Sequence, residues 1–171
     1  DTAIAKAYYE IAEMYYGSNL DTVFDLCNQS IKIIKSSLTL KPSESKKLKL
    51  QEILAKNYYL LGVAYFKLDN YKKAIALNEK VIYLLSEIDN ISLIAETFNN
   101  LGSIYTTLGD LNTAYKYYMD AIKALETTKE TRSLAYAYNN ASVMLYKLEK
   151  FEEAEKYIKK SIDIHKENND D

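Results

Sequence analysis

A sequence pattern recurs every 40 residues along most of this chain, and this internal repeat constrains the fold more than any other feature. Three blocks of similar residues align at this interval, namely 58–65, 98–105 and 138–145. An alanine follows each block at a constant distance, at Ala74, Ala114 and Ala154. One such repeat is too small to bury an apolar core by itself, so the chain is predicted to be a stack of similar units.

A weaker first copy aligns with the second at a shift of 50 residues. At this shift three pairs coincide: Ala12 with Gly62, Tyr15 with Tyr65 and Asn28 with Asn78. The ten extra residues surround Pro42, the single proline of the chain, and are predicted to form a loop at about 39–45. Four repeats therefore cover nearly the whole chain, at about 1–38, 46–87, 88–127 and 128–167.

Each repeat is predicted to form two helices, because its apolar residues recur every three or four positions. In the third repeat, Gly109 is expected to end the first helix and Asp110 to cap the second. Asp69–Asn70 and Glu149–Lys150 form the corresponding turns. The eight expected helices span about 2–17, 20–38, 46–68, 71–87, 91–108, 111–126, 130–148 and 151–167.

Composition supports an all-α protein. The 171 residues include 4 Gly and 1 Pro, fewer turn residues than a β-sandwich or a Rossmann-type fold requires. The formal net charge of −2 disfavours direct binding to nucleic acid by this domain, which would need a concentrated basic face. A membrane-spanning helix would need about 18 consecutive apolar residues, and no such run occurs.

The sequence also gives no sign of catalysis. One Cys and one His cannot form an internal disulfide or a four-ligand zinc site. The phosphate-binding, dinucleotide-binding and hydrolase motifs are missing. We therefore expect no catalytic residues, no metal and no cofactor. Without a signal-peptide pattern, a cytoplasmic location is expected. Because the chain starts at Asp1 within a predicted helix, we also expect a fragment of a longer protein.

The repeated residues resemble the tetratricopeptide repeat family. The family pattern has a large residue, a Leu-Gly pair, a tyrosine, an alanine, an aromatic residue and a second alanine at fixed offsets. The third repeat matches it with Phe98, Leu101, Gly102, Tyr105, Ala114, Tyr118 and Ala121. The first repeat matches least well, with Tyr8, Ile11, Ala12, Tyr15, Phe24, Asn28 and Ile31. The period of 40 exceeds the usual 34 residues, and the proline between repeats is absent. In both respects the chain is similar to the kinesin-light-chain branch and to the Rap/PlcR-type bacterial peptide receptors.

The resemblance implies a right-handed superhelical solenoid of antiparallel helix pairs, formed by residues 1–171 as a single array. The first helix of each repeat would line a concave groove that binds an extended peptide or a helix. The positions that point inward in the family correspond here to Lys6, Tyr9, Glu13, Tyr16, Lys56, Tyr59, Val63, Phe66, Glu96, Asn99, Ser103, Thr106, Tyr136, Asn139, Val143 and Tyr146. From these and two neighbouring asparagines we predict ligand-binding residues Lys56, Tyr59, Glu96, Asn99, Asn100, Ser103, Tyr136, Asn139, Asn140 and Val143.

The chemistry of these residues suits a peptide ligand. An asparagine amide offers donors and an acceptor, so it pairs with the N–H and C=O of a peptide backbone at once. Asn99 and Asn139 lie one repeat apart. Asn100 and Asn140 are expected either to help or to hold adjacent helices in register. Tyrosine adds flat apolar area at a small cost in conformational entropy.

Three functions remain open at this stage. The first is a non-enzymatic module that binds a protein or peptide in the groove. The second is the sensor domain of a bacterial regulator that responds to a peptide pheromone, which would require an upstream DNA-binding or effector domain. The third is a structural scaffold that associates with itself.

Three further predictions concern the second helices. The last helix carries an apolar stripe that is expected to meet a second copy of the chain, as a homodimer, or missing repeats: Phe151, Ala154, Tyr157, Ile158, Ile162 and Ile164. Cys27 is expected to be a small packing residue. His165 is expected to be solvated or to complement the helix dipole.

Overall fold

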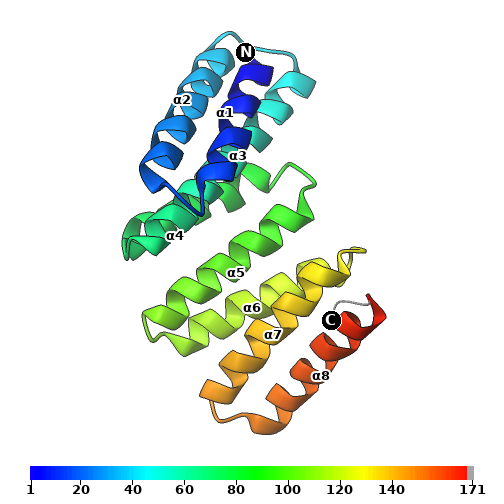
Figure 1. Ribbon diagram of the computed structural model, residues 1–171. Coiled ribbons are helices and arrows are strands. Elements are labelled where there is room, and N and C mark those ends of the chain that lie inside the picture. Colours follow the sequence, from blue (N-terminus) through cyan, green and yellow to red (C-terminus); the bar gives the residue numbers. More distant parts are fainter. Residues whose placement is uncertain (169–171) are drawn as a thin grey trace. The chain divides into compact units, whose positions relative to one another are not determined.

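Eight α-helices form the described part of the chain in the computed structural model, which describes residues 1–168 (Figure 1). They are α1 (Thr2–Tyr15), α2 (Leu20–Thr39), α3 (Glu44–Lys67), α4 (Tyr71–Leu85), α5 (Ile91–Thr107), α6 (Leu111–Leu125), α7 (Thr131–Lys147) and α8 (Phe151–Glu167). No strand occurs among these residues. The predicted all-α fold of paired helices is confirmed, with every helix end within two residues of its predicted position.

The helices group into two compact units. Unit 1 spans Asp1–Asp89 and contains α1 to α4, and unit 2 spans Asn90–Asp171 and contains α5 to α8. In each unit, every helix packs against the next one, and the first and third helices also touch each other. Figure 1 shows α7 and α8 running side by side in this way. Each unit thus holds two of the predicted repeats, and the single array of four remains a prediction. Within the described residues, no helix is long and apolar enough to cross a membrane.

Three of the four turns inside the repeats share one geometry. Asp69, Gly109 and Glu149 have positive φ angles of 55°, 80° and 60°. Such a left-handed residue ends a helix and turns the chain back. At the next position, Asn70 and Asp110 accept hydrogen bonds from backbone N–H groups of the following helix, at 3.3 and 3.1 Å. The predicted end of one helix at Gly109 and the cap of the next by Asp110 are therefore confirmed.

In the first repeat, the chain from the aligned tyrosine to the cap of the second helix is one residue shorter, and the turn has no left-handed residue. The N–H of Asn19 donates to the carbonyl of Tyr15, four residues back, whereas that of Asn70 donates to Tyr65, five residues back. Asn19 and Asn70 both cap the second helix of their repeats, so the helices α2 and α4 align at a shift of 51.

The missing residue before Asn19 changes the alignment of α2 with α4 from a shift of 50 to a shift of 51. The prediction that Asn28 corresponds to Asn78 is wrong, because Asn28 is exposed while Asn78 is buried. Cys27 takes the buried position instead. Likewise, the positions assigned to Phe24 and Ile31 belong to fully buried residues one place earlier, Val23 and Ser30. The repeat period alone did not reveal that one residue is missing before α2, because α2 has apolar residues at the expected positions in both alignments, with a shift of 50 or of 51.

Small residues of the first helices lie opposite the second helices of their repeats. A Cβ atom added to Gly102 would lie 2.6 Å from the Tyr118 ring, and one added to Gly62 would lie 2.9 Å from the Asn78 amide. Both approaches are too close for real side chains. At Gly102 the three nearest atoms all belong to the buried Tyr118 ring, so the size of that ring requires glycine there; at Gly62 the nearest atom is the end of the flexible Asn78 side chain.

A buried polar link joins the first three helices. The hydroxyl of Ser30 in α2 donates to the carbonyl of Ala5 in α1, at 2.8 Å. The amide of Asn57 in α3 donates to the same hydroxyl at 3.0 Å and to the carbonyl of Ile53 at 2.8 Å. Ser30 and Asn57 are fully buried, so these bonds fix the relative positions of α1, α2 and α3.

The apolar stripe predicted on α8 is largely covered by unit 2 itself. Ala154 is buried, and Tyr157 and Ile164 pack against the core of the unit. Phe151 and Ile162 are the large hydrophobic side chains of α8 that remain exposed, among the described residues. The expectation of a stripe without any cover within the chain is therefore wrong for most of its length, since the partner helix α7 fills that role.

Candidate functional site

The residues of unit 2 that were expected to point into the groove form one stripe on each of two neighbouring helices. The α5 stripe consists of Glu96, Asn99, Ser103 and Thr106, and the α7 stripe consists of Tyr136, Asn139, Val143 and Tyr146. Spacings of three and four residues place the members of each stripe on one helix face. Because α5 and α7 touch directly, both stripes belong to the same unit surface.

The α5 stripe is polar and contains a side-chain oxygen that accepts no hydrogen bond within the described residues. The side-chain oxygen Oδ1 of Asn99 is shielded from solvent and has no hydrogen-bond partner among the described residues. The hydroxyl of Ser103 donates to the backbone carbonyl of Asn99 at 3.1 Å. Glu96 at the start of the stripe is exposed. The stripe therefore presents an acidic group followed by a half-buried amide and hydroxyls.

One residue that supports this surface from below was not predicted from the sequence. The ring of Tyr118 crosses above Gly102, and its hydroxyl lies 3.2 Å from that of Ser103 and 3.4 Å from that of Thr106. Tyr118 is 5% exposed, so it supports the polar α5 stripe from the second helix of the repeat without being a surface residue itself. A signal was present in the sequence, because glycine at position 102 leaves room for a ring to cross the helix.

The α7 stripe is apolar where the α5 stripe is polar. Tyr136, Val143 and Tyr146 take the places of Glu96, Ser103 and Thr106, and their exposed fractions are 58%, 49% and 66%. The asparagine is retained in both stripes, as Asn99 and Asn139.

Two aromatic contacts with α8 support the ends of the α7 stripe. The Tyr136 ring meets the His165 ring edge-on at 5.9 Å, and the Tyr146 ring meets Phe151 at 5.3 Å. His165 is half-buried in this contact, and it lies in the last turn of α8, which fits the second of its two predicted roles, complementing the helix dipole. The aromatic rings at both ends of the α7 stripe are therefore held by α8.

The neighbouring asparagines differ from each other. Asn100 is buried, with 8% of its surface exposed, whereas Asn140 is half-buried. Of the two roles predicted for Asn100, the structure therefore favours holding adjacent helices together over contact with a ligand. A shift of one residue along a helix turns the side chain by about 100°, which separates Asn100 from Asn99.

The predicted residues of unit 1 lie on α3. Lys56 forms an ion pair with Glu52 at 3.0 Å, and both side chains are about one third exposed. Tyr59 and Val63 are half-buried on the same helix face, and Phe66 contacts the Tyr71 ring at 6.0 Å. This stripe is less exposed than the α7 stripe and has a charge that is already paired.

Burial and a nearby carboxylate both raise the pKa of Tyr138, which neighbours the α7 stripe. Burial raises the pKa of the Tyr138 phenol, and the hydrogen bond that it donates to Glu126 at 2.8 Å raises it further. The phenol therefore stays protonated at neutral pH and holds α7 to the end of α6. Its role is structural, since the hydroxyl is engaged inside the unit.

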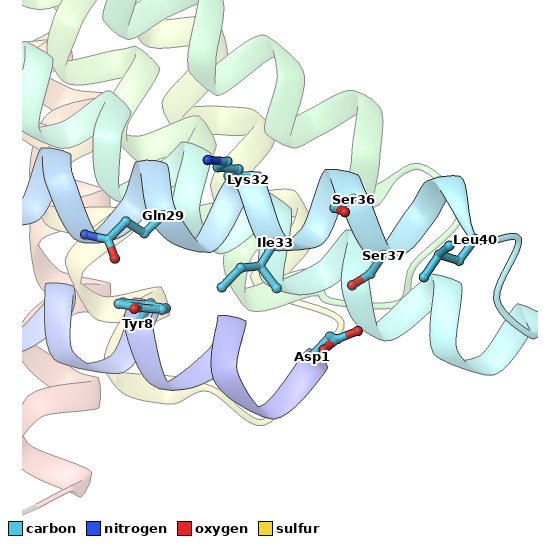
Figure 2. A pocket seen from close by; sticks show the side chains of 8 residues that line it. All are labelled: Asp1, Tyr8, Gln29, Lys32, Ile33, Ser36, Ser37 and Leu40. Carbon is cyan, nitrogen blue, oxygen red and sulfur yellow. The ribbon is translucent and has the colours of Figure 1, made fainter.

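A cavity of about 470 Å³ lies between α1 and α2 (Figure 2). Its lining residues are Asp1, Tyr8, Gln29, Lys32, Ile33, Ser36, Ser37 and Leu40. Figure 2 shows that the Lys32 side chain points away from α1. The Gln29 amide is bound to the Asp25 carboxylate at 2.9 Å. The cavity contains none of the predicted site residues.

Family models settle the identity of the repeats. A tetratricopeptide repeat model matches residues 93–167, and a second tetratricopeptide repeat model matches residues 55–84. Together these matches cover more than half of the chain and include both units. The chain belongs to the tetratricopeptide repeat family.

Solved structures of tetratricopeptide repeat type share the fold. Aspartyl phosphate phosphatase F from Bacillus subtilis matches with a TM-score of 0.85 and 22% identity, over 99% of this chain and 42% of that one. NprR in complex with its cognate peptide NprX matches with a TM-score of 0.73 and 24% identity, over 95% of this chain and 45% of that one.

A third structure is the Rap conjugation gene regulator of the plasmid pLS20 in complex with the Phr* peptide. It has a TM-score of 0.79 and 17% identity, over 99% of this chain and 44% of that one. This tetratricopeptide repeat chain thus spans less than half the length of these three proteins. No curated protein sequence matches it.

Proposed function

We propose that this tetratricopeptide repeat chain is a non-enzymatic module that binds an extended peptide or protein segment along the α5 and α7 stripes. The observation that carries the proposal is the exposed set of Tyr136, Val143 and Tyr146 around Asn139. Exposed tyrosines are typical of binding surfaces, because they supply apolar area and a hydrogen-bonding hydroxyl together. The named phosphatase activity of one structural neighbour belongs to that neighbour.

The asparagines supply the backbone contacts in this proposal. Rotation of the half-buried Asn99 side chain would bring its shielded Oδ1 to the surface to accept an N–H of the ligand, and Asn139 makes the equivalent contact one repeat further. The α7 stripe then receives an apolar ligand side chain, while Glu96 favours a cationic group at the other end. Asn140 stays in the proposed ligand-binding set as a neighbour of the α7 stripe, and Lys56 and Tyr59 stay in it as residues of unit 1.

A sensor domain of a peptide-responsive bacterial regulator is the second candidate. It is supported by the likeness in fold to NprR and to the plasmid pLS20 regulator, both solved with a bound peptide. This candidate places the chain in the cytoplasm and requires a separate DNA-binding or effector domain. Finding such a domain in the same protein would favour it over a general binding module.

Replacing Asn99 and Asn139 with alanine is expected to weaken peptide binding with little effect on stability. Each lost hydrogen bond is worth about 0.5–1.5 kcal/mol, so each change raises Kd by about 2- to 12-fold. Peptides of about 12 residues, selected on the wild-type chain by phage display, serve as the probe, and calorimetry measures Kd. Asn112→Ala, which removes an exposed amide from α6, is the matched control.

Equal affinities for the wild type and the Asn99→Ala/Asn139→Ala double variant would place the binding site elsewhere. Failure to select any peptide that binds would contradict the proposed function itself.

A further inference from the structure

Positive charge is concentrated in the segment that leads into the second repeat. Residues 41–49 include four lysines and one glutamate, which gives this segment a net charge of +3. The whole chain has a net charge of −2, which leaves −5 for all the other residues. A short basic segment in an otherwise acidic chain attracts anions to one place on the surface.

Most of this basic segment belongs to an extension of α3 that the other first helices of the described repeats lack. At the 40-residue period, the starts of α5 at Ile91 and of α7 at Thr131 both correspond to Gln51. Helix α3 begins earlier, at Glu44, so it has about two additional turns. Leu50 in these turns is fully buried, which anchors the extension to unit 1.

A cavity of about 470 Å³ lies between this extension and α1. Its polar lining residues, which we define as the basic pocket, are Thr2, Lys6, Ser43, Ser45, Lys46 and Lys49. The remaining lining residue is Ala3, so the described residues around the cavity include no carboxylate and no aromatic ring. Because α1 and α3 touch each other within unit 1, one unit forms the whole pocket.

The donors of the basic pocket are available to a ligand. Lys46 and Lys49 are exposed and form no ion pair within residues 1–168. Lys6 pairs with Glu10 at 3.1 Å, but both side chains are more than half exposed, and such surface pairs are weak and easily exchanged. The hydroxyl of Ser43 makes no capping hydrogen bond to α3, although this residue occupies the N-cap position.

We propose that the basic pocket binds the phosphate group of a phosphorylated peptide segment, at a phosphoserine or a phosphothreonine. Such a group carries about −1.5 to −2 charges at neutral pH and has three acceptor oxygens. The three ammonium groups of the pocket balance this charge, and its three hydroxyls add further donors. Glu44, the glutamate of the basic segment, is already paired with Lys47 at 3.1 Å.

The size and lining of the pocket favour a phosphorylated peptide over other anions. A free phosphate ion would occupy only a small part of the cavity, whose volume is typical of sites for larger ligands. Single-stranded nucleic acid usually stacks its bases on aromatic rings, and no such ring lines the pocket. An anionic membrane is flat, whereas the lysines come from two helices around a cavity. A phosphorylated side chain reaches into such a cavity while its flanking residues remain at the rim.

Binding of two peptide libraries tests the proposal. Both libraries consist of fluorescent peptides with random flanks, and the central residue is phosphoserine in one and serine in the other. Fluorescence anisotropy measures Kd at constant ionic strength. The pocket variant is Lys46→Gln/Lys49→Gln. Its matched control, Lys32→Gln/Lys35→Gln, removes the same charge from exposed positions with the same spacing on α2, outside the basic pocket. Circular dichroism confirms that each variant keeps its helices.

The wild type and the control variant are expected to bind the phosphoserine library at least about tenfold more tightly than the serine library. The pocket variant is expected to lose this preference. Lys6→Gln, which removes the third ammonium group from the opposite helix, is expected to weaken phosphoserine binding by about two- to fivefold. The Asn99→Ala/Asn139→Ala variant is expected to bind the phosphoserine library like the wild type, because the basic pocket is independent of the α5 and α7 stripes.

Equal binding of the two libraries by the wild type would overturn the proposal. An equal loss in the pocket variant and in the control would also overturn it, because positive charge anywhere on unit 1 would then suffice. Inorganic phosphate and vesicles containing phosphatidylserine are the two remaining probes. Binding of either one as tight as that of the phosphoserine library would assign the lysines to a free anion or to a membrane surface instead.

Discussion

Replacing Gly102 with leucine is expected to lower the free energy of unfolding by about 1–3 kcal/mol or more. Even the Cβ of a side chain at this position would lie 2.6 Å from Cε1 of Tyr118. The tyrosine ring is 5% exposed and its hydroxyl is held near Ser103, so the ring has little room to move aside. Chemical denaturation measures this loss of stability, provided that the wild type and the variant have the same m-value.

Two comparisons separate this clash from other effects of the substitution. Gly17→Ala adds a Cβ where no atom lies within 4 Å, and it is expected to leave stability nearly unchanged. In the first repeat, Ala12 and Cys27 occupy the positions of Gly102 and Tyr118. Gly102→Ala is therefore expected to be tolerated much better when Tyr118→Cys is also present. Equal effects of Gly102→Ala in both backgrounds would show that the ring is not the cause.

Cys27 is expected to be inert toward thiol reagents in the folded protein and reactive in denaturant. Its side chain is fully buried, and burial raises the pKa of the thiol from 9.0 to about 12. The nucleophile is the thiolate, so a shift of this size lowers its population at neutral pH about a thousandfold. Because the chain has 1 Cys, the colour released from an aromatic disulfide reagent reports this residue alone. Rapid reaction under native conditions would contradict the position of α2.

The same burial predicts a loss of stability at alkaline pH. Above about pH 9 the unfolded thiol releases its proton while the folded one retains it, so the folded state binds more protons. Stability then falls as pH rises, by up to about 1.4 kcal/mol per pH unit until the folded pKa is reached. The raised pKa values of Tyr138 and Tyr157 act in the same direction.

A Cys27→Val variant isolates the thiol from these tyrosines. The stability difference between wild type and variant is expected to be constant below about pH 9 and to change in favour of the variant above it. A difference that stays constant up to about pH 11 would show that burial does not hold the proton on Cys27.

The sequence alone determined the helices and most of their boundaries. Apolar spacing placed eight helices, and Gly109 and Asp110 identified how one helix ends and the next begins. These features depend on interactions between residues a few positions apart, which a single sequence displays directly. The period of 40 residues then indicated the family that the two repeat models match.

Tertiary structure decided the features that depend on contacts between helices. The segment from Tyr15 to Asn19 is one residue shorter than its equivalent in the second repeat, and this shows that Cys27, and not Asn28, is the counterpart of Asn78. The choice between Asn99 and Asn100 as a surface residue also required the packing of neighbouring helices. A repeat pattern shows which positions are equivalent, but exposure depends on whether another helix covers them. Met14 and Met144 are equivalent in sequence, and the presence of α6 beside α7 buries only the second.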